Sequence, residues 1–317
     1  MSSILEAQHL KKYFKVPSGL LHAVDDVSFS IKKGETLGVV GESGCGKSTL
    51  GRLLLRLIEC DAGKVLFDGQ DVTAQNAQGM HALRMRMQMI FQDPFSSLDP
   101  RMSVRDTISE PLKIYKITKS SDETNERVEE MMDTVGLSKR FASSYPHELD
   151  GGRQQRIGIA RALILNPDFL VCDEPVSALD VSIQAQILNL MQDLKQEKGL
   201  TYMFITHDLS VVKHISESIC VMYLGKTVET CPTKELFKNP THPYTQALLS
   251  AIPIPEIDIN RKRILLHGEL SSPINPQPGC RFAPRCQYSL DLCHKVTPEL
   301  SEVAPNHFVA CHLCEKR

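Results

Sequence analysis

Residues 41–49 are Gly41-Glu42-Ser43-Gly44-Cys45-Gly46-Lys47-Ser48-Thr49, which fits the pattern G-x-x-x-x-G-K-[ST]. Glycines let a backbone wrap closely around phosphate oxygens, and the N-terminus of a following helix adds positive potential. The pattern directs Lys47 to the outer phosphates and the Ser48 hydroxyl to a Mg²⁺ ion. The alternative is a glycine-rich turn that occurs by chance.

The residues on either side favour the phosphate site. TLGVV at 36–40 is a short apolar run, typical of a strand covered on both faces, and LGRLLLRLIEC at 50–60 has apolar residues at helical spacing. Strand, glycine-rich turn and helix therefore follow in the order that the motif needs. We interpret Cys45 as a small residue of the loop, since nothing near it indicates a resolving thiol.

Two acids follow a second apolar run, FLVCDE at 169–174. At the carboxyl end of a strand, Asp173 can hold Mg²⁺ directly or through water, and Glu174 can polarise an attacking water. The alternative is a pair of acids that favour the N-terminus of a helix. The phosphate loop upstream favours the catalytic interpretation. Elsewhere, residues 61–92 indicate short strands and turns, and residues 101–145 indicate charged helices that include a C-cap at Gly136.

The composition is that of a globular protein. The 317 residues are 42% apolar and 23% charged, with a net charge of −2, which excludes wholesale disorder and shows no basic field for nucleic acid. No apolar run approaches 18 residues, and the start, MSSILEAQHLKKYF, lacks the apolar region of a signal peptide. We therefore expect a soluble cytosolic chain.

Between the two motifs lies Leu149-Asp150-Gly151-Gly152-Arg153-Gln154-Gln155-Arg156. In this order the motifs resemble the ATP-binding subunits of ABC transporters, whose signature is usually L-S-G-G-Q. Gln92 in MIFQDP is similar to the Q-loop, SALD ending at Asp180 to the D-loop, and His207 in FITHD to the switch histidine. Tyr13 occupies the place of the aromatic residue that stacks on adenine. The resemblance covers residues 3–230 and rests on the ordered set, since a lone histidine, glutamine or tyrosine indicates little.

The resemblance implies an α/β fold: a P-loop ABC ATPase core with a helical signature subdomain and a small Cys-rich C-terminal extension. It implies ATP and Mg²⁺ as ligands, with the ion held by Ser48, Gln92 and Asp173. It also implies that Glu174 orients water, that Lys47 and His207 stabilise developing charge, and that Gln92 senses the γ-phosphate. The nucleotide contacts expected are Tyr13, Gly41, Ser43, Gly44, Cys45, Gly46, Lys47, Ser48, Thr49, Asp150, Gly151, Gly152 and Asp180.

The signature departs from the family pattern at Asp150, where serine is usual. In the family two subunits bind ATP head-to-tail, and the signature serine of one donates to the γ-phosphate held by the other. A carboxylate there is unfavourable by on the order of 1–4 kcal/mol. We expect an asymmetric pair in which the site that uses Asp150 is weak or silent; the alternative is that Asp150 simply caps a helix.

The C-terminal part changes in composition: residues 231–310 contain 11 of the 18 prolines. NPTHPYTQALL at 239–249 resembles the His-Pro-Tyr extension of oligopeptide and dipeptide importer ATPases, and DEPVSALDVSIQAQ is typical of the same subfamily. From the residues alone, 239–249 indicates only a proline-punctuated segment followed by a short helix.

Five of the ten cysteines lie within residues 280–317. Their spacing, C-x5-C-x6-C-x17-C, is open to zinc or to an iron–sulfur cluster, because structural zinc sites favour C-x2-C pairs and clusters take four cysteines at varied spacings. The pattern GCRFAPRC…C…HFVACHLC is similar to the cysteine module of the peptide importers, which implies a [4Fe-4S] cluster on Cys280, Cys286, Cys293 and Cys311. Zinc stays the alternative, and Cys314 is interpreted as a spare thiol.

We expect three parts: an ABC ATPase domain at 1–230 with its helical subdomain at about 93–165, a proline-rich extension at 231–278, and a Cys-rich module at 279–317. The implied function is to power import of di- or oligopeptides, or of small solutes such as nickel chelates. The implied partners are two permease subunits, a second non-identical ATPase and, through the permeases, an extracytoplasmic solute-binding protein, with no nucleic acid, at the cytoplasmic face of the membrane. The alternatives are a soluble ABC ATPase acting on nucleic acid or ribosomes, and a regulatory subunit that binds ATP with little turnover.

Overall fold

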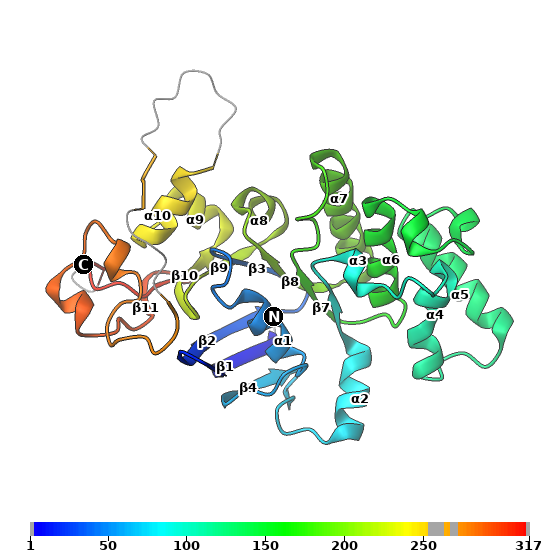
Figure 1. Cartoon of the computed structure of the whole chain (residues 1–317), viewed down its shortest axis with the longest axis horizontal. Helices are drawn as coiled ribbons and strands as arrows, with labels where there is room; N and C mark the ends of the chain where they lie inside the picture. Colours follow the sequence, from blue (N-terminus) through cyan, green and yellow to red (C-terminus); the bar gives the residue numbers. More distant parts are fainter. Residues whose placement is uncertain (1–2, 253–262, 267–271, 315–317) are drawn as a thin grey trace. The chain divides into compact units, whose positions relative to one another are not determined.

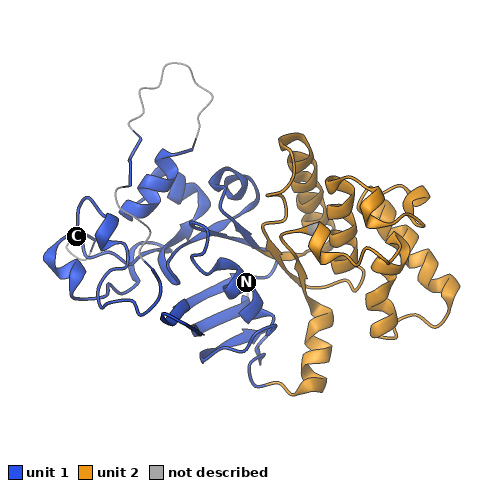
Figure 2. Cartoon of the chain, in the orientation of Figure 1, with its two compact units in different colours: residues 1–74, 204–317 blue, residues 75–203 orange. Residues whose placement is uncertain are grey.

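The computed structural model describes residues 3–252, 263–266 and 272–314. It has two compact units: residues 1–74 with 204–317 form the first, and residues 75–203 form the second (Figure 2). The expected part boundaries at 230 and 278 stay predictions. Within the described ranges, no helix has both the length and the apolar character that a membrane span requires.

The first unit contains an antiparallel sheet with the strand order β2-β1-β4-β5, of which Figure 1 labels β2, β1 and β4. Its strands are β1 (Ser3–Val16), β2 (Gly19–Lys32), β4 (Ala62–Phe67) and β5 (Gln70–Asp71). Strands β1 and β2 pair along nearly their whole length, from Ser3 opposite Lys32 to the turn at Val16 and Gly19. This long hairpin carries Tyr13.

The same unit contains a second group of strands around β3 (Thr36–Val40) and β9 (Ser218–Tyr223), which are parallel. Strand β10 (Lys226–Pro232) pairs antiparallel with β9 and with β12 (His307–Val309), which pairs in turn with β11 (Ser301–Ala304). All five residues of β3 are buried, as expected for TLGVV. The C-terminal residues therefore extend a sheet that begins beside the phosphate loop.

The helices of the first unit are short, and three of them follow residue 208. They are α1 (Lys47–Leu54), α8 (Leu209–Ile215), α9 (Thr233–Lys238) and α10 (Pro243–Ser250), with single turns η3 (Ala283–Arg285) and η4 (Asp291–His294). Helix α10 is the short helix predicted after the prolines at 240 and 243, and Pro243 is its first residue, where its missing amide costs nothing. Strand β8 (Thr201–Thr206) spans the sequence boundary of the two units.

The second unit is mainly helical around the parallel pair β6 (Met87–Ile90) and β7 (Phe169–Asp173). Its helices are α2 (Ala77–Arg86), α3 (Pro94–Ser97), α4 (Val104–Ile114), α5 (Ser121–Thr134), α6 (Gly151–Leu163) and α7 (Val181–Lys198), with the turns η1 (Lys139–Phe141) and η2 (Pro146–Glu148). Gly136 has φ 66° just after α5, which confirms the predicted C-cap. The prediction of strands and turns alone for 61–92 is wrong at α2, whose N-cap Asn76 accepts from the Gly79 amide.

Candidate functional site

The predicted phosphate loop directly follows β3 and ends at α1 in the first unit. Gly46 is the N-cap of α1 with φ 102°, and a Cβ on it would lie 1.9 Å from the Ala23 carbonyl oxygen, so only glycine fits. The Lys47 side chain is buried, and its Nζ donates to the carbonyls of Gly41 at 2.8 Å and Glu42 at 3.0 Å. The loop therefore curls around its own lysine, with the start of α1 behind it.

Cys45 lies inside this loop and is buried. Burial raises the pKa of its thiol, although the neighbouring Lys47 charge acts in the opposite direction. A protonated, buried thiol is a poor nucleophile, which supports the interpretation of Cys45 as a small packing residue. Its carbonyl accepts from the Gly225 amide at 2.8 Å, which ties the loop to the turn after β9.

Tyr13, the expected adenine contact, is half-buried on β1. Its ring stacks on His22 with centroids 4.0 Å apart, and its hydroxyl donates to Asp25 Oδ1 at 2.6 Å. Burial and the hydrogen bond with Asp25 raise the pKa of Tyr13, so it stays a phenol. Asp25, which the sequence analysis did not single out, holds the Tyr13 hydroxyl across the hairpin.

His207 follows the carboxyl end of β8 and is exposed. The next residue, Asp208, donates its amide to Thr206 Oγ1 at 3.0 Å and caps α8 by accepting from the Ser210 amide at 2.7 Å. These two bonds fix the backbone on either side of His207. The imidazole is thus presented from a rigid turn between a buried strand and a helix.

The second unit brings together Gln92 and Glu174, whose Nε2 and Oε2 atoms are 3.0 Å apart in a hydrogen bond. Gln92 lies two residues after β6 and Glu174 directly after β7, and Ile90 pairs with Cys172 in the parallel register. The carboxyl ends of neighbouring parallel strands thereby place both side chains at one edge. Asp173 is buried at the end of β7, and Glu174 has φ 46°, an uncommon conformation for a non-glycine residue. A carboxylate held by an amide in this way can orient a water molecule.

The signature segment begins α6, and Asp150 is its N-cap. Asp150 Oδ1 accepts from the Arg153 amide at 2.9 Å, while Oδ2 pairs with Arg153 Nη1 at 2.7 Å. The helix-capping alternative for Asp150 is therefore realised within this chain, and Arg153 offsets its charge. Gly152 is buried, and a Cβ on it would lie 2.7 Å from Ile183 on α7. Asp180 caps α7 through the Ile183 amide at 3.0 Å, whereas Gly151 is exposed.

The four cysteines expected to hold a metal centre lie in the first unit and influence one another electrostatically. The charges of Cys293 and Cys311 both act on the pKa of Cys280, which burial raises to about 11, and on that of Cys286. Zn–S bonds of about 2.3 Å would require sulfurs roughly 4 Å apart. Among the described residues, no three of these sulfurs lie within 4.8 Å of one another.

Within the described residues, the one group of three potential ligands that does converge is Glu229, Cys231 and His307. Glu229 is fully buried and accepts from the amides of Thr241 at 2.8 Å and His242 at 3.0 Å. His307 Nε2 lies 2.7 Å from Glu229 Oε1. Protein donors therefore compensate this carboxylate, and the group joins β10 and β12 to the segment just before α10.

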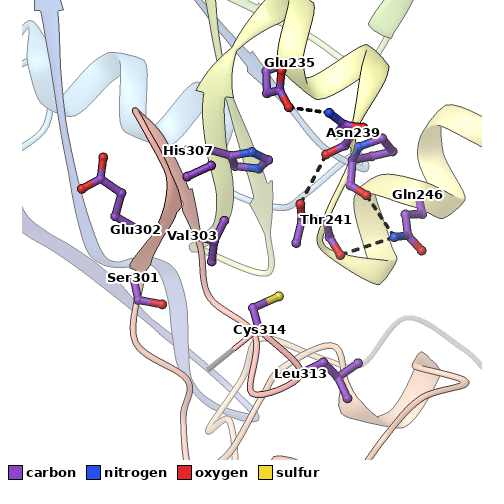
Figure 3. Close-up of a pocket in the computed structure, with 12 residues that line it drawn as sticks. Glu235, Asn239, Thr241, Gln246, Ser301, Glu302, Val303, His307, Leu313 and Cys314 are labelled. Carbon is purple, nitrogen blue, oxygen red and sulfur yellow. Dashed lines mark hydrogen bonds between the residues drawn. The ribbon is translucent and has the colours of Figure 1, made fainter. Parts of the chain in front are cut away.

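A pocket of about 800 Å³ lies beside the C-terminal strands (Figure 3). Asn239 Nδ2 donates to Glu235 Oε1 at 2.7 Å, and Gln246 Nε2 donates to the Pro240 carbonyl at 3.0 Å. Figure 3 shows Glu235, Asn239 and Gln246 on one side, with Ser301, Glu302 and Val303 on the other. The polar side chains of Glu235 on α9 and Gln246 on α10 bond to other groups of the protein. We therefore interpret this pocket as a gap between packed segments and not as a ligand site.

A strand, a phosphate loop and a helix, together with acids at the end of a parallel strand, define a P-loop ATPase. The family described as "ABC transporter" matches residues 24–177, and that described as "Oligopeptide/dipeptide transporter, C-terminal region" matches residues 228–293. This chain belongs to the ABC transporter family. It is an ATPase cassette whose hydrolysis of ATP is coupled to transport.

Similar proteins cover nearly the whole chain. The oligopeptide transport ATP-binding protein AppF of Bacillus subtilis is 54% identical over 98% of this chain and 97% of its own length. OppF of the same organism is 52% identical over 97% of this chain and 96% of its own. Among solved structures, the dimeric ATP-binding cassette MJ0796 bound to ADP and Pi has a TM-score of 0.67 at 28% identity, over 72% of this chain and 98% of that one. The expected ABC ATPase fold is confirmed, while the Cys-rich module stays a prediction.

Proposed function

We propose that this chain powers the import of di- or oligopeptides through a membrane channel formed by other subunits. The observation that carries the proposal is similarity over nearly the full length, including residues 228–293, to proteins named for oligopeptide transport. Substrate choice lies with the permeases and the solute-binding protein. The same chain could therefore power the import of small solutes such as nickel chelates instead of peptides. The chain acts at the cytoplasmic face of the membrane, attached to two permeases.

The catalytic roles that we propose are those that the motifs and the family imply, and the geometry of each unit supports them. Lys47 and the amides around Gly46 bind the phosphates, and Tyr13 stacks on the base. Glu174, oriented by Gln92, holds the attacking water, and His207 contacts the γ-phosphate. Ser48, Gln92 and Asp173 are the residues that would hold Mg²⁺, which neutralises phosphate charge when it is bound.

Asp150 makes the pair of ATP sites unequal. Its carboxylate is half-exposed at the start of α6 and pairs with Arg153 of the same chain. A serine would cap the helix equally well and would offer a hydroxyl donor to a phosphate. The partner is therefore a second, non-identical ATPase with an intact signature, and the site that contains Asp150 turns over weakly.

The cysteine module holds a [4Fe-4S] cluster through Cys280, Cys286, Cys293 and Cys311. Support comes from the similarity of the cysteine pattern to that of the peptide importers and from the electrostatic effects of Cys293 and Cys311 on both Cys280 and Cys286. A hydrogen bond between the Cys314 and Cys311 thiols raises the pKa of Cys311, and we take Cys314 as a neighbour of the cluster rather than a fifth ligand. The cluster serves as a staple for a short segment that has few strands.

The test is a mild-detergent purification of the tagged chain from its native membranes, with the co-purifying proteins identified by mass spectrometry. Two permeases and a second, different ATPase are the expected result. Soluble partners alone, such as ribosomal proteins, would contradict the transporter role. ATP turnover of the purified complex, with and without Glu174→Gln, then distinguishes a catalytic ATPase subunit from a regulatory subunit that only binds ATP.

A further inference from the structure

The cysteine module contacts the phosphate loop directly. Arg285, in the turn between Cys280 and Cys286, forms a two-pronged ion pair with Glu42: Nη1 lies 2.8 Å from Oε2, and Nη2 lies 3.2 Å from Oε1. Glu42 is the second residue of the loop, and its carbonyl accepts from Lys47. Arg285, 243 residues further along the chain, therefore holds Glu42, whose carbonyl accepts a hydrogen bond from Lys47 of the loop.

The surroundings of the pair are rigid. The Glu42 amide donates to the Tyr244 hydroxyl at 2.9 Å, and Tyr244 is fully buried on α10. Phe282, also buried, packs against Tyr244 and Tyr223 with ring centroids 5.4 Å and 5.3 Å away. The backbone and the carboxylate of Glu42 are thus both fixed by residues of the C-terminal extension.

Arg285 is suited to this contact. Its side chain is 9% exposed, while that of Glu42 is 23% exposed. Its Nη1 and Nη2 atoms both donate to the Glu42 carboxylate, which accepts through its two oxygens. A planar guanidinium matches a carboxylate with two parallel bonds, which fixes direction as well as charge.

We propose that Arg285 is a positioning residue for nucleotide binding: it neutralises the Glu42 carboxylate and turns it toward the cysteine module, away from the phosphates. The inference rests on the proposed phosphate-binding role of the loop and deepens it. Without Arg285, an uncompensated negative charge would remain on a loop that receives a polyanion. Because Arg285 directly precedes Cys286, the fold of the cysteine module determines where the guanidinium lies.

Removal of the Glu42 charge distinguishes this role from general support of the fold, because it should restore ATP binding only if Arg285 acts through that charge. Arg285→Ala is expected to raise the Kd for MgATP about tenfold, the size of one charge repulsion in a partly screened site. Removing the negative charge as well, in Arg285→Ala/Glu42→Gln, is expected to recover most of that loss. A residue that only supported the fold would show the same loss in both backgrounds.

The experiment is this double-mutant cycle on the full chain, with Kd measured by equilibrium dialysis against radiolabelled ATP and Mg²⁺. Arg281→Ala is the matched control, because Arg281 lies in the same segment, is equally buried, and bonds to Asp25 and the Leu224 carbonyl rather than to the loop. Glu42→Gln should rescue Arg285→Ala but not Arg281→Ala. Arg285→Lys, which keeps the charge without the fork, should show an intermediate Kd.

Three results would overturn the inference: an unchanged Kd in Arg285→Ala, equal losses in both Glu42 backgrounds, or rescue of Arg281→Ala by Glu42→Gln. If Arg285→Ala does not fold, the same cycle with Arg285→Gln measures how strongly Arg285 and Glu42 are coupled in the Kd for MgATP. Lys47→Ala tests the underlying site separately. Loss of binding in Lys47→Ala alone, with Arg285→Ala unaffected, rejects the positioning role and leaves the ATP site in place.

Discussion

His242 makes the first unit sensitive to acid, and this can be measured. Its Nδ1 accepts from the Tyr244 amide at 3.1 Å as the N-cap of α10, so Nδ1 must be unprotonated. Its Nε2 is buried and has no hydrogen-bond partner within the described residues. The neutral ring is therefore built into the fold, and protonation of Nδ1 would place a hydrogen against the Tyr244 amide.

The size of the effect follows from the pKa. Burial lowers the pKa of His242 from its ordinary 6.5 to about 4, although the nearby Glu229 acts in the opposite direction. Because the folded-state pKa is the lower one, the stability that it contributes is present above pH 6.5 and is lost as the pH falls toward 4. As the pH falls, the unfolded chain takes up the proton first. This lowers the free energy of unfolding by about 2 kcal/mol at pH 5 and by about 3 kcal/mol in all.

The assay is urea unfolding at pH 7.5 and pH 5.0, followed by circular dichroism. His242→Asn keeps an oxygen that can cap α10 but cannot titrate, so its stability should fall by about 2 kcal/mol less than that of the wild type. His147→Asn, at an exposed histidine in the second unit, should behave like the wild type. An equal drop in stability for His242→Asn and the wild type would refute the reasoning.

Three further predictions concern the loop, the signature and the cysteines. Gly46→Ala should abolish ATP binding in dialysis and lower the free energy of unfolding by more than about 2 kcal/mol, because its Cβ would lie 1.9 Å from the Ala23 oxygen; binding near the wild-type level would contradict the loop geometry. Asp150→Ala should cost about 1 kcal/mol as a lost cap, whereas Asp150→Ser should keep stability and raise the ATPase rate of the assembled complex; an unchanged rate and ATP occupancy would reject the asymmetric pair. Cys280→Ser should lower the iron and acid-labile sulfide of anaerobically purified protein, and unaltered iron content would argue against the cluster.

The sequence analysis succeeded where the signal is local. The phosphate loop, the strand before it and the helix after it occupy contiguous residues, so a glycine pattern and an apolar run were enough to predict them. The C-cap at Gly136 depends on a single residue type at the end of a helix. Helix α2 was missed because it buries only Met80 and Leu83 and contains Gly79, which leaves little apolar periodicity to detect.

Contacts between distant segments could not be predicted in this way. Glu42 and Arg285 each have the sequence properties of a solvated charge, and their pairing depends on how the C-terminal extension returns to β3 and β9. The hydrogen bond from the Glu42 amide to the Tyr244 hydroxyl could not be predicted either, because the sequence around His-Pro-Tyr indicated only a short helix. One local signal was available: Arg281 and Arg285 lie within a segment bounded by two candidate metal ligands.

The central claim is that this chain converts ATP hydrolysis into peptide import. The most direct measurement is ATP-dependent uptake of a labelled oligopeptide by proteoliposomes that contain the purified complex and its solute-binding protein. Glu174→Gln should lower both uptake and ATP turnover by on the order of 10²-fold or more, as for loss of a group that activates water. Glu197→Gln, at an exposed acid on α7, should leave both at the wild-type level. ATP turnover without peptide uptake, or uptake that persists in Glu174→Gln, would contradict the claim.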